Sequence, residues 1–400
     1  MAYHIFIRRI ITMDYLKRAF ELKDVMVADR RTVHQFAEIG MDTVQTADYV
    51  MAELTKLGYE PKRCGGNGVV ATIGNGGKTL LLRADMDALP FPEDSGEEFA
   101  ATNGHSHSCG HDLHTAWLLG AARMLKENEA ALEGTVKFMW QPGEETFQGS
   151  KAMLADGVLE GVDAAMACHA AAGQIPLGLV MYNDKNTMMY SNDSFKITCV
   201  GYPSHGAYPE YGIDPINIAV HVYQGLQNLI AREKSSTIPM VLTVGKINAG
   251  VANNSLPGEC VMEGTMRGTD KELREKLKAR LVTTAEKIAE AFGGKAIVEW
   301  TAEVPPAICN PEMVKSVIGY LGEVGVQGFY PVPDMQASAS EDFACVLEQV
   351  PGVLLYISTG YVDRPVAAAH DPKVIYNEDA ICQAAAYIAH AATRWLADNK

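Results

Sequence analysis

Strand-like and helix-like segments alternate along most of the 400-residue chain, and this alternation restricts the fold more than any other feature. The strand-like segments are short apolar runs, at 68–73, 78–86, 135–140, 162–168 and 352–358. The helix-like segments have apolar residues at helical spacing, at 46–57, 114–128, 150–154 and 380–397. This pattern predicts an α/β fold in which helices cover both faces of a mostly parallel sheet.

The middle of the chain follows a different order. It has two helical segments, at 215–232 and 269–292, and we expect the second to open with a capping box of Thr269 and Glu272. The strand-like runs around them lie at 194–200, 240–247, 260–267 and 295–301. The order β-α-β-β-α-β predicts a ferredoxin-like α+β domain. Because 400 residues suit two domains, we predict an inserted domain at 190–302 within a discontinuous domain at 13–189 and 303–400.

The charge of the chain argues against some classes of partner. Lys and Arg number 34 against 49 Asp and Glu, which gives a formal net charge of -15. Nucleic acids and anionic membranes require a basic protein face, so we expect neither as a partner. No apolar run reaches the roughly 18 residues of a membrane span, so we expect no membrane segment.

We expect a cytoplasmic protein. Arg8 and Arg9 interrupt the apolar stretch at the start, which makes it a poor signal peptide. Met13 begins a more regular amphipathic segment, so one interpretation is that translation starts there and that residues 1–12 are a wrongly assigned start. The 8 cysteines are scattered without a short spacing, which predicts free and mostly buried thiols.

Polar side chains follow several of the predicted strands. Asp85 and Asp87 come at the end of one strand, Glu144 and Glu145 follow the next, and His169 ends a third. Ligands of parallel α/β sheets bind beyond the carboxyl ends of the strands, so we expect these side chains to form a site. Just before a predicted helix, five further candidates crowd into ten positions: His105, His107, Cys109, His111 and His114.

The pair Cys109 and His111 has three interpretations. A loop histidine is most often a hydrogen-bonded structural residue, and a cysteine followed closely by a histidine can be a catalytic thiolate with its base. Four histidines and a cysteine beside two acidic strand ends favour the third interpretation, a metal site. Thiolate, imidazole and carboxylate ligands together suit Zn, Mn, Co or Ni.

The simplest interpretation of the pair Glu144 and Glu145 is a solvent-exposed turn without a functional role. However, Pro142 and Gly143 break the strand just before the pair, so the two adjacent side chains need not point to opposite faces. One carboxylate can then bind a metal while its neighbour accepts a proton. Metal-assisted hydrolysis uses this combination.

The remaining histidines differ in their setting. His169 follows an apolar run and is a good candidate for a metal ligand. His221 and His390 lie on amphipathic helices and are interpreted as structural. His370 follows a loop and has no distinguishing context of its own.

Taken together, these motifs resemble the M20 metallopeptidases, in particular their aminoacylase, hippurate hydrolase and auxin-conjugate hydrolase subfamily. Order and spacing match from about residue 30 to the end of the chain. The matching segments are Leu82-Arg-Ala-Asp-Met-Asp-Ala-Leu-Pro90, Cys109-Gly-His-Asp112, Gln141-Pro-Gly-Glu-Glu145 with Gly149, His169, Gly201-x-x-Ser-His205-x-Ala-x-Pro209, Asp214-Pro215, Ala252-x-Asn254-x-x-Pro257, Gly264-Thr-x-Arg267, Glu341-Asp-Phe343 and His370-x-Pro372.

The resemblance implies an amidohydrolase that removes the acyl group from an N-acyl amino acid with the help of two divalent metal ions. It implies that Glu144 is the general base that takes a proton from water, and then the acid that protonates the leaving nitrogen. It also implies that Cys109 bridges the two ions. The full set of implied ligands is Cys109, His111, Glu145, His169 and His370.

The resemblance also assigns residues outside the ligand set. His205, on the inserted lid and dimerisation domain, would stabilise the oxyanion in the site of a partner subunit, which implies a homodimer or higher homo-oligomer. Asn254 and Arg267 would hold the substrate carboxylate. Asp87 would orient a metal ligand. Weaker candidates for such support are Asp85, Asp112, His114 and Glu341.

Three departures from the family pattern border the expected site. Ala37 stands where a proline is usual, Thr102–His107 differs from the common Met-His-Ala before the cysteine, and Ala170–Ala172 replaces bulkier residues. The substrate within the class therefore stays open among simple N-acetyl amino acids, hippurate, indole-acyl amino acids and N-acetyl-diaminopimelate. Two other functions are alternatives: a cysteine-nucleophile hydrolase that uses Cys109 and His111, and a non-catalytic metal-binding homologue.

Overall fold

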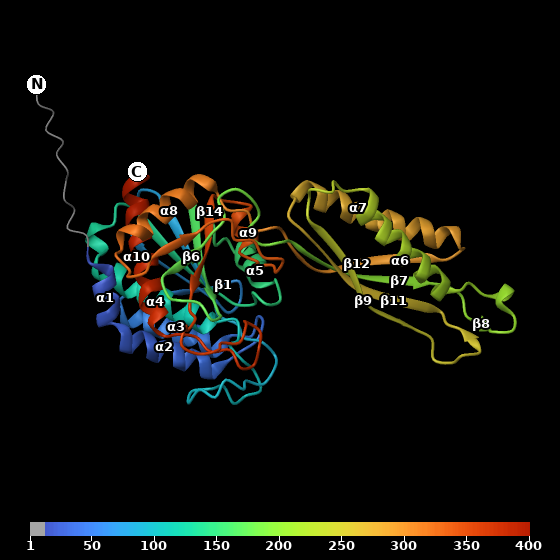
Figure 1. Ribbon diagram of the computed structural model, residues 1–400, viewed down its shortest axis with the longest axis horizontal. Helices are drawn as coiled ribbons and strands as arrows, with labels where there is room; N and C mark the ends of the chain where they lie inside the picture. The colour runs from blue at the N-terminus through green and yellow to red at the C-terminus, as the bar shows by residue number, and fades with distance from the viewer. Residues whose placement is uncertain (1–12) are drawn as a thin grey trace, which may run out of the picture. The chain divides into compact units, whose positions relative to one another are not determined.

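The structure is a computed structural model that describes residues 13–400 (Figure 1). The interpretation of residues 1–12 therefore lies outside the described part. Contacts within the chain define two compact units. The first comprises the chain up to Lys185 with Cys309–Met335 and Val346–Lys400, and the second comprises Asn186–Ile308 and Gln336–Cys345. The second unit is thus wider than the 190–302 expected for an inserted domain, and it takes in 336–345, which the sequence assigned to the other domain.

The first unit is built on an eight-stranded sheet with the order β1-β2-β4-β3-β5-β14-β6-β13. Four neighbouring strands, β4, β3, β5 and β14, run parallel, while β1, β2 and β6 pair in the antiparallel sense. The mostly parallel α/β class predicted from the sequence is therefore confirmed. The strands are β1 (Lys62–Cys64), β2 (Gly68–Gly74), β3 (Thr79–Asp85), β4 (Thr135–Gln141), β5 (Ala164–Ala171), β6 (Leu179–Met181), β13 (Tyr330–Val332) and β14 (Gly352–Ser358).

Two helices, α4 (His111–Glu127) and α10 (Asp379–Asp398), pack against each other and against β3. Nearly all of their residues are buried, and the many alanines of α10 allow this close approach. Between Met13 and Lys400, no helix combines the length and the apolar character that crossing a membrane requires. The other helices around this sheet are α1 (Tyr15–Glu21), α2 (Lys23–Phe36), α3 (Val44–Lys56), α5 (Gly149–Ala155) and α8 (Pro311–Glu323). The short α9 (Ala344–Leu347) spans the chain boundary between the two units.

The start of α4 differs from the sequence expectation, which placed it at His114. The helix begins at His111 because Gly110 adopts a left-handed conformation, with φ of 86°, and turns the chain into the first helical turn. Glycine adopts this conformation without the steric cost that a Cβ would bring. His111 is therefore fixed by a rigid, buried helix instead of a loop.

The second unit contains a four-stranded antiparallel sheet with the order β12-β7-β11-β9. Along the chain, the main elements of this unit are β7 (Asn192–Val200), α6 (Pro215–Arg232), β9 (Met240–Ala249), β11 (Glu259–Gly268), α7 (Lys271–Ala291) and β12 (Lys295–Val304). This β-α-β-β-α-β arrangement agrees with the ferredoxin-like prediction. A small additional ladder pairs β8 (Ser204–His205) with β10 (Ser255–Leu256).

The core of the second unit lies between its sheet and its two helices. Alternate strand residues such as Ile197 and Met262 point toward α6 and α7, where they pack with Val222 and Leu281. The capping box predicted at Thr269 is wrong. Asp270 caps α7 instead, since its side chain accepts a hydrogen bond from the Leu273 amide at 2.7 Å.

Candidate metal centre

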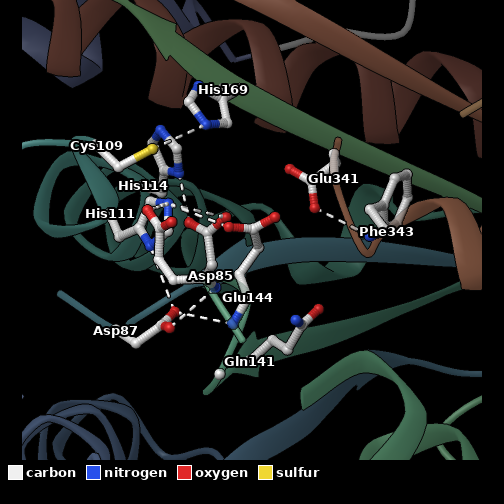
Figure 2. Close-up of polar contacts among 12 residues, drawn as sticks. Asp85, Asp87, Cys109, His111, His114, Gln141, Glu144, His169, Glu341 and Phe343 are labelled. Carbon is white, nitrogen blue, oxygen red and sulfur yellow. Dashed lines mark hydrogen bonds and ion pairs between the residues drawn. The ribbon is translucent and has the colours of Figure 1, made fainter. Parts of the chain in front are cut away.

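The candidate site lies in the first unit, where the carboxyl ends of three neighbouring strands meet. Asp85 at the end of β3 is in register with Gln141 at the end of β4, and Arg83 is in register with Ala167 of β5. The segments that follow these positions therefore converge. Figure 2 shows the side chains of Asp85, Cys109, His111, Glu144 and His169 gathered at this point.

The structure brings together all five implied metal ligands and the implied base. The ligand atoms within each of three trios lie within 4.8 Å of one another: Cys109, His111 and His169; Cys109, Glu145 and His370; His111, Glu144 and Glu145. The Cys109 Sγ lies 3.6 Å from His169 Nε2, and His370 Nε2 lies 3.4 Å from Glu145 Oε1. Cys109 and His111 each belong to two of these trios, so the ligand atoms form one continuous cluster.

The donor atoms at the centre of this cluster fit a divalent cation. His111 Nε2 and Glu145 Oε1 are buried and have no hydrogen-bond partner, although they lie 3.9 Å from each other. Leaving such a buried polar atom unsatisfied costs roughly 1–3 kcal/mol, so native structures rarely do it without a reason. A cation bound between thiolate, imidazole and carboxylate groups would satisfy these atoms, and these ligand types suit Zn and related metals.

The hydrogen bonds of His169 prepare its ring as a ligand. Its Nδ1 lies 2.8 Å from the Ala170 carbonyl oxygen, which can only accept, so Nδ1 carries the proton. In the neutral ring, the lone pair is then on Nε2, the atom that faces Cys109. Metal-binding histidines are commonly oriented by a hydrogen bond of this kind.

His114 lies close enough to Asp85 and His111 to form a further potential ligand group with them, but both of its ring nitrogens already have hydrogen-bond partners. Its Nδ1 lies 2.5 Å from Asp85 Oδ1, and its Nε2 accepts a hydrogen bond from the Ala170 amide at 2.8 Å. Burial lowers the pKa of His114 to about 3, so the ring is neutral at physiological pH. Asp85 also accepts a hydrogen bond from Arg83 at 2.7 Å. The contacts of Asp85, His114 and Ala170 therefore link β3, α4 and β5 next to the ligand cluster.

Asp87 holds the backbone of both glutamates. Its Oδ1 accepts from the Glu144 amide at 3.0 Å and its Oδ2 accepts from the Glu145 amide at 3.1 Å, and it also lies 3.4 Å from His111 Nδ1 (Figure 2). The carboxylate is fully buried. The sequence predicts that Asp87 orients one metal ligand, and its observed position allows it to orient a ligand and the neighbouring base together.

The turn that carries the two glutamates requires glycine at two positions. Gly143 has a φ of 64°, and its carbonyl oxygen accepts hydrogen bonds from the amides of Gln148 and Gly149. A Cβ on Gly149 would overlap the Pro142 carbonyl group, since it would lie 2.6 Å from the carbonyl carbon. This contact explains why residue 149 is a glycine.

We expect Gly149→Ala to lower kcat/KM by about 100-fold or more, because a displacement of about 1 Å at a catalytic group can cost that much. The overlap cannot be relieved without moving the turn that holds Glu144. Steady-state kinetics on the purified variant would measure the loss. Gly319→Ala is the matched control, because a Cβ there meets open space. Native activity in Gly149→Ala would contradict this account of the turn.

Two tyrosines near the ligands were not anticipated from the sequence. Tyr356 stacks on His169 with ring centroids 4.6 Å apart, and Tyr376 donates a hydrogen bond from its hydroxyl group to the Ser108 carbonyl at 2.8 Å. The His370 amide donates to the same carbonyl at 2.9 Å. Tyr356 belongs to an apolar strand run, so nothing in its sequence context distinguishes it from a core residue.

The three other predicted site residues lie in the second unit. His205 is exposed on β8, in register with Ser255 of β10. Asn254 is also exposed, just before β10, and its carbonyl oxygen accepts from the Gly206 amide. Arg267 is half-buried on β11 and donates to the Ser340 hydroxyl at 3.1 Å.

Comparison with known proteins agrees with this geometry. Residues 81–394 match the model of peptidase family M20/M25/M40. The chain belongs to this family. The M20 family resemblance inferred from the sequence motifs is thereby confirmed.

Two relatives with named activities match almost the whole M20 chain. N-acetyl-L-cysteine deacetylase of Bacillus subtilis is 35% identical over 385 residues, which cover 95% of this chain and 90% of that protein. IAA-amino acid hydrolase ILR1-like 4 of Arabidopsis thaliana is 34% identical over 388 residues, which cover 94% and 87%.

Solved structures also match the M20 chain along its length. A dinuclear metal-binding peptidase of family M20 from Bacillus subtilis aligns with a TM-score of 0.80 and 29% identity, over 95% of this chain and 100% of that one. An aminohydrolase from methicillin-resistant Staphylococcus aureus aligns with a TM-score of 0.90 and 27% identity, over 97% and 99%.

Proposed function

We propose that this protein is a metal-dependent amidohydrolase that splits N-acyl amino acids into a carboxylic acid and a free amino acid. The observation that carries the proposal is the convergence of the buried Cys109, His111 and His169 with the half-buried Glu145, with Glu144 4.0 Å from the His111 ring. The named activities of the relatives, a deacetylase of N-acetyl-L-cysteine and an IAA-amino acid hydrolase, support the substrate class.

The five ligands, Cys109, His111, Glu145, His169 and His370, would hold two divalent ions. The two trios that share Cys109 support this assignment, as does the dinuclear centre named for the related peptidase. Zn, Mn, Co and Ni all suit these ligands. When bound, the ions would polarise the amide carbonyl and increase the acidity of water.

Glu144 would perform the proton transfers. Its backbone is held by Asp87, and its side chain is 7% exposed at the edge of the ligand cluster. From this position the carboxylate would accept a proton from the attacking water. It would then donate that proton to the nitrogen that leaves with the amino acid.

His205 would stabilise the negative oxygen that develops during attack. Its Nδ1 accepts a hydrogen bond from the Ala207 amide at 3.1 Å, so the neutral ring carries its proton on Nε2 and can donate it. Because His205 is exposed on its own unit, we propose that it acts in the site of a second copy, within a homodimer or higher homo-oligomer. Sedimentation that finds a fully active monomer would contradict this role.

Arg267, with Asn254, would bind the substrate carboxylate. Between Met13 and Lys400, no carboxylate forms an ion pair with Arg267, and burial lowers its pKa. A half-buried guanidinium group without an anionic partner is well suited to a carboxylate, which it can bind through two parallel hydrogen bonds. The second domain would therefore serve as the lid that recognises the amino acid.

We expect Arg267→Gln to raise KM for N-acyl amino acids by about 100-fold, because losing one partner of a desolvated charge pair costs roughly 2–5 kcal/mol. The corresponding N-acyl amino acid amides, which lack the carboxylate, should show little change. Kinetics on matched pairs of acid and amide would measure the difference. Arg280→Gln, which removes an exposed arginine paired with Glu233, is the control. An equal loss on both substrates would contradict the assignment.

The reaction is tested by ninhydrin detection of free amino acid released from acetyl, benzoyl, indole-acyl and long-chain acyl amino acids. Release that depends on added metal would support the proposal. The small side chains of Ala170–Ala172 suggest a roomy acyl pocket, which a sharp preference for acetyl substrates would contradict. If metal binds but no substrate of the panel is cut, the proposed substrate class is wrong.

We also propose a cytoplasmic location. All eight cysteines are buried and none forms a disulfide, as expected in a reducing compartment.

A further inference from the structure

We propose that a buried ion cluster of Arg30, His34, Glu93 and Asp112 positions two of the metal-binding segments relative to each other. This inference rests on the proposed function, because it assigns a role in shaping the metal centre. The cluster joins helix α2 to the first turn of α4 on one side, and to the segment 93–101 on the other. We call 93–101 the strap.

His34 is the central member of the cluster. Its Nδ1 lies 2.8 Å from Asp112 Oδ2 and its Nε2 lies 2.9 Å from Glu93 Oε2. Burial lowers the pKa of His34, but the hydrogen bonds with the two carboxylates outweigh burial and raise the pKa to about 9. The ring therefore carries both protons at neutral pH and donates one to each carboxylate.

On the α4 side, the cluster acts through Asp112. This residue directly follows His111 and is fully buried. Its Oδ2 accepts from His34 and also from Arg30 Nε at 2.8 Å. Two cationic donors from α2 thus fix the residue next to a metal ligand. If they were lost, the first turn of α4 could move, and His111 would move with it.

On the strap side, the cluster acts through Glu93. Besides His34, Glu93 accepts from the Ala101 amide at 2.8 Å, so it draws the two ends of the strap together. Phe99 of the strap packs edge-on against His34, with ring centroids 5.0 Å apart. The Asp94 amide then donates to the Pro372 carbonyl at 2.8 Å, two residues beyond His370. The strap is therefore tied both to α2 and to the segment that carries His370.

Stability alone does not explain why charged residues occupy this place. Buried ion pairs often contribute no more stability than apolar residues of similar volume, because desolvation offsets their attraction. Here a single protonated ring contacts both Asp112 and Glu93, and each carboxylate leads to a different metal-binding segment. The cluster therefore sets the position of the first turn of α4 relative to the strap, which apolar packing would define less sharply.

The test measures Co²⁺ binding to the metal-free full-length protein, independently of catalysis. We expect His34→Gln to weaken Co²⁺ binding by about 10- to 100-fold, the usual effect of losing a residue that supports metal ligands, and to alter the Co²⁺ absorption spectrum. Its kcat should fall while KM stays near the wild-type value. His390→Gln is the matched control, because His390 also pairs with a carboxylate, that of Glu323, and belongs to none of the potential metal-binding groups among residues 13–400.

Wild-type affinity and spectrum in His34→Gln would overturn the role of the cluster. Failure of the wild-type protein to bind Co²⁺ would instead overturn the metal centre, so the two failures are distinguishable. If circular dichroism shows that His34→Gln does not fold, the Glu93→Gln variant tests the inference in its place. It removes the negative charge that faces His34 on the strap side and leaves Asp112 in place, and it should still change the spectrum. An unchanged spectrum in a folded Glu93→Gln protein would overturn the inference.

Discussion

The Glu144→Gln variant is expected to lose hydrolysis while it keeps its metal ions. General acid–base groups typically contribute 10²–10⁴-fold to the rate, and Glu144 is proposed to act both as base and as acid, so we expect kcat to fall by about 10³-fold or more. Gln has nearly the same shape and keeps the backbone amide that donates to Asp87. The loss therefore reports on the missing proton acceptor and not on a displaced turn.

The neighbouring Glu145→Gln variant provides the contrast. Glu145 Oε1 lies among the metal-binding atoms, 3.4 Å from His370 Nε2, so this variant is expected to lose metal as well as activity. Measuring kcat and bound metal for both variants separates the two roles. If Glu144→Gln kept its kcat, or if the two variants lost metal equally, the assignment of Glu144 as base and Glu145 as metal ligand would be wrong.

Removal of the metal ions is expected to abolish activity, and resupply with Zn, Mn, Co or Ni is expected to restore it. The alternative of a thiolate nucleophile at Cys109 predicts that the metal-free enzyme stays active. Burial and the adjacent carboxylates of Glu145 and Glu144 raise the pKa of this thiol well above its ordinary value. A thiol in that setting stays protonated and is a poor nucleophile.

The chelation experiment compares dialysed protein treated with a chelator against protein treated with the same chelator already saturated with Zn²⁺. Activity is followed by amino acid release, and folding is followed by circular dichroism. Full activity of folded, metal-free protein would favour Cys109 as nucleophile. Metal binding without any hydrolysis would favour the third alternative, a non-catalytic homologue.

The long elements of the fold were predictable because local patterns define them. β14 and α6 have the bounds expected from the sequence, since apolar runs there are flanked by clear breaks. The edge strands β1 and β13 and their short neighbour β6 have three residues each, which is too short for any periodicity. The cap of α7 at Asp270 was missed because two neighbouring residues, Thr269 and Asp270, could both cap a helix.

The candidate site was predictable to the extent that its residues follow strands or match family motifs. Asp87, Glu144 and Glu145 closely follow strand ends and His169 lies near the end of β5, so the α/β pattern itself brings them together. The supporting contacts depend on pairs that are far apart in sequence. His34 meets Asp112 across 78 residues, and Tyr376 meets Ser108 across 268, and no local pattern records such a pairing.

The hydrogen bonds from the main chain to Asp87 affect how this site can be altered by mutation. Because the carboxylate holds the amides of residues 144 and 145, these two contacts do not depend on which side chains those residues carry. Shape and reactivity are thus encoded by different residues. Mutagenesis or natural divergence can exchange the reacting groups at 144 and 145 one at a time, and new chemistry can be installed without rebuilding the loop.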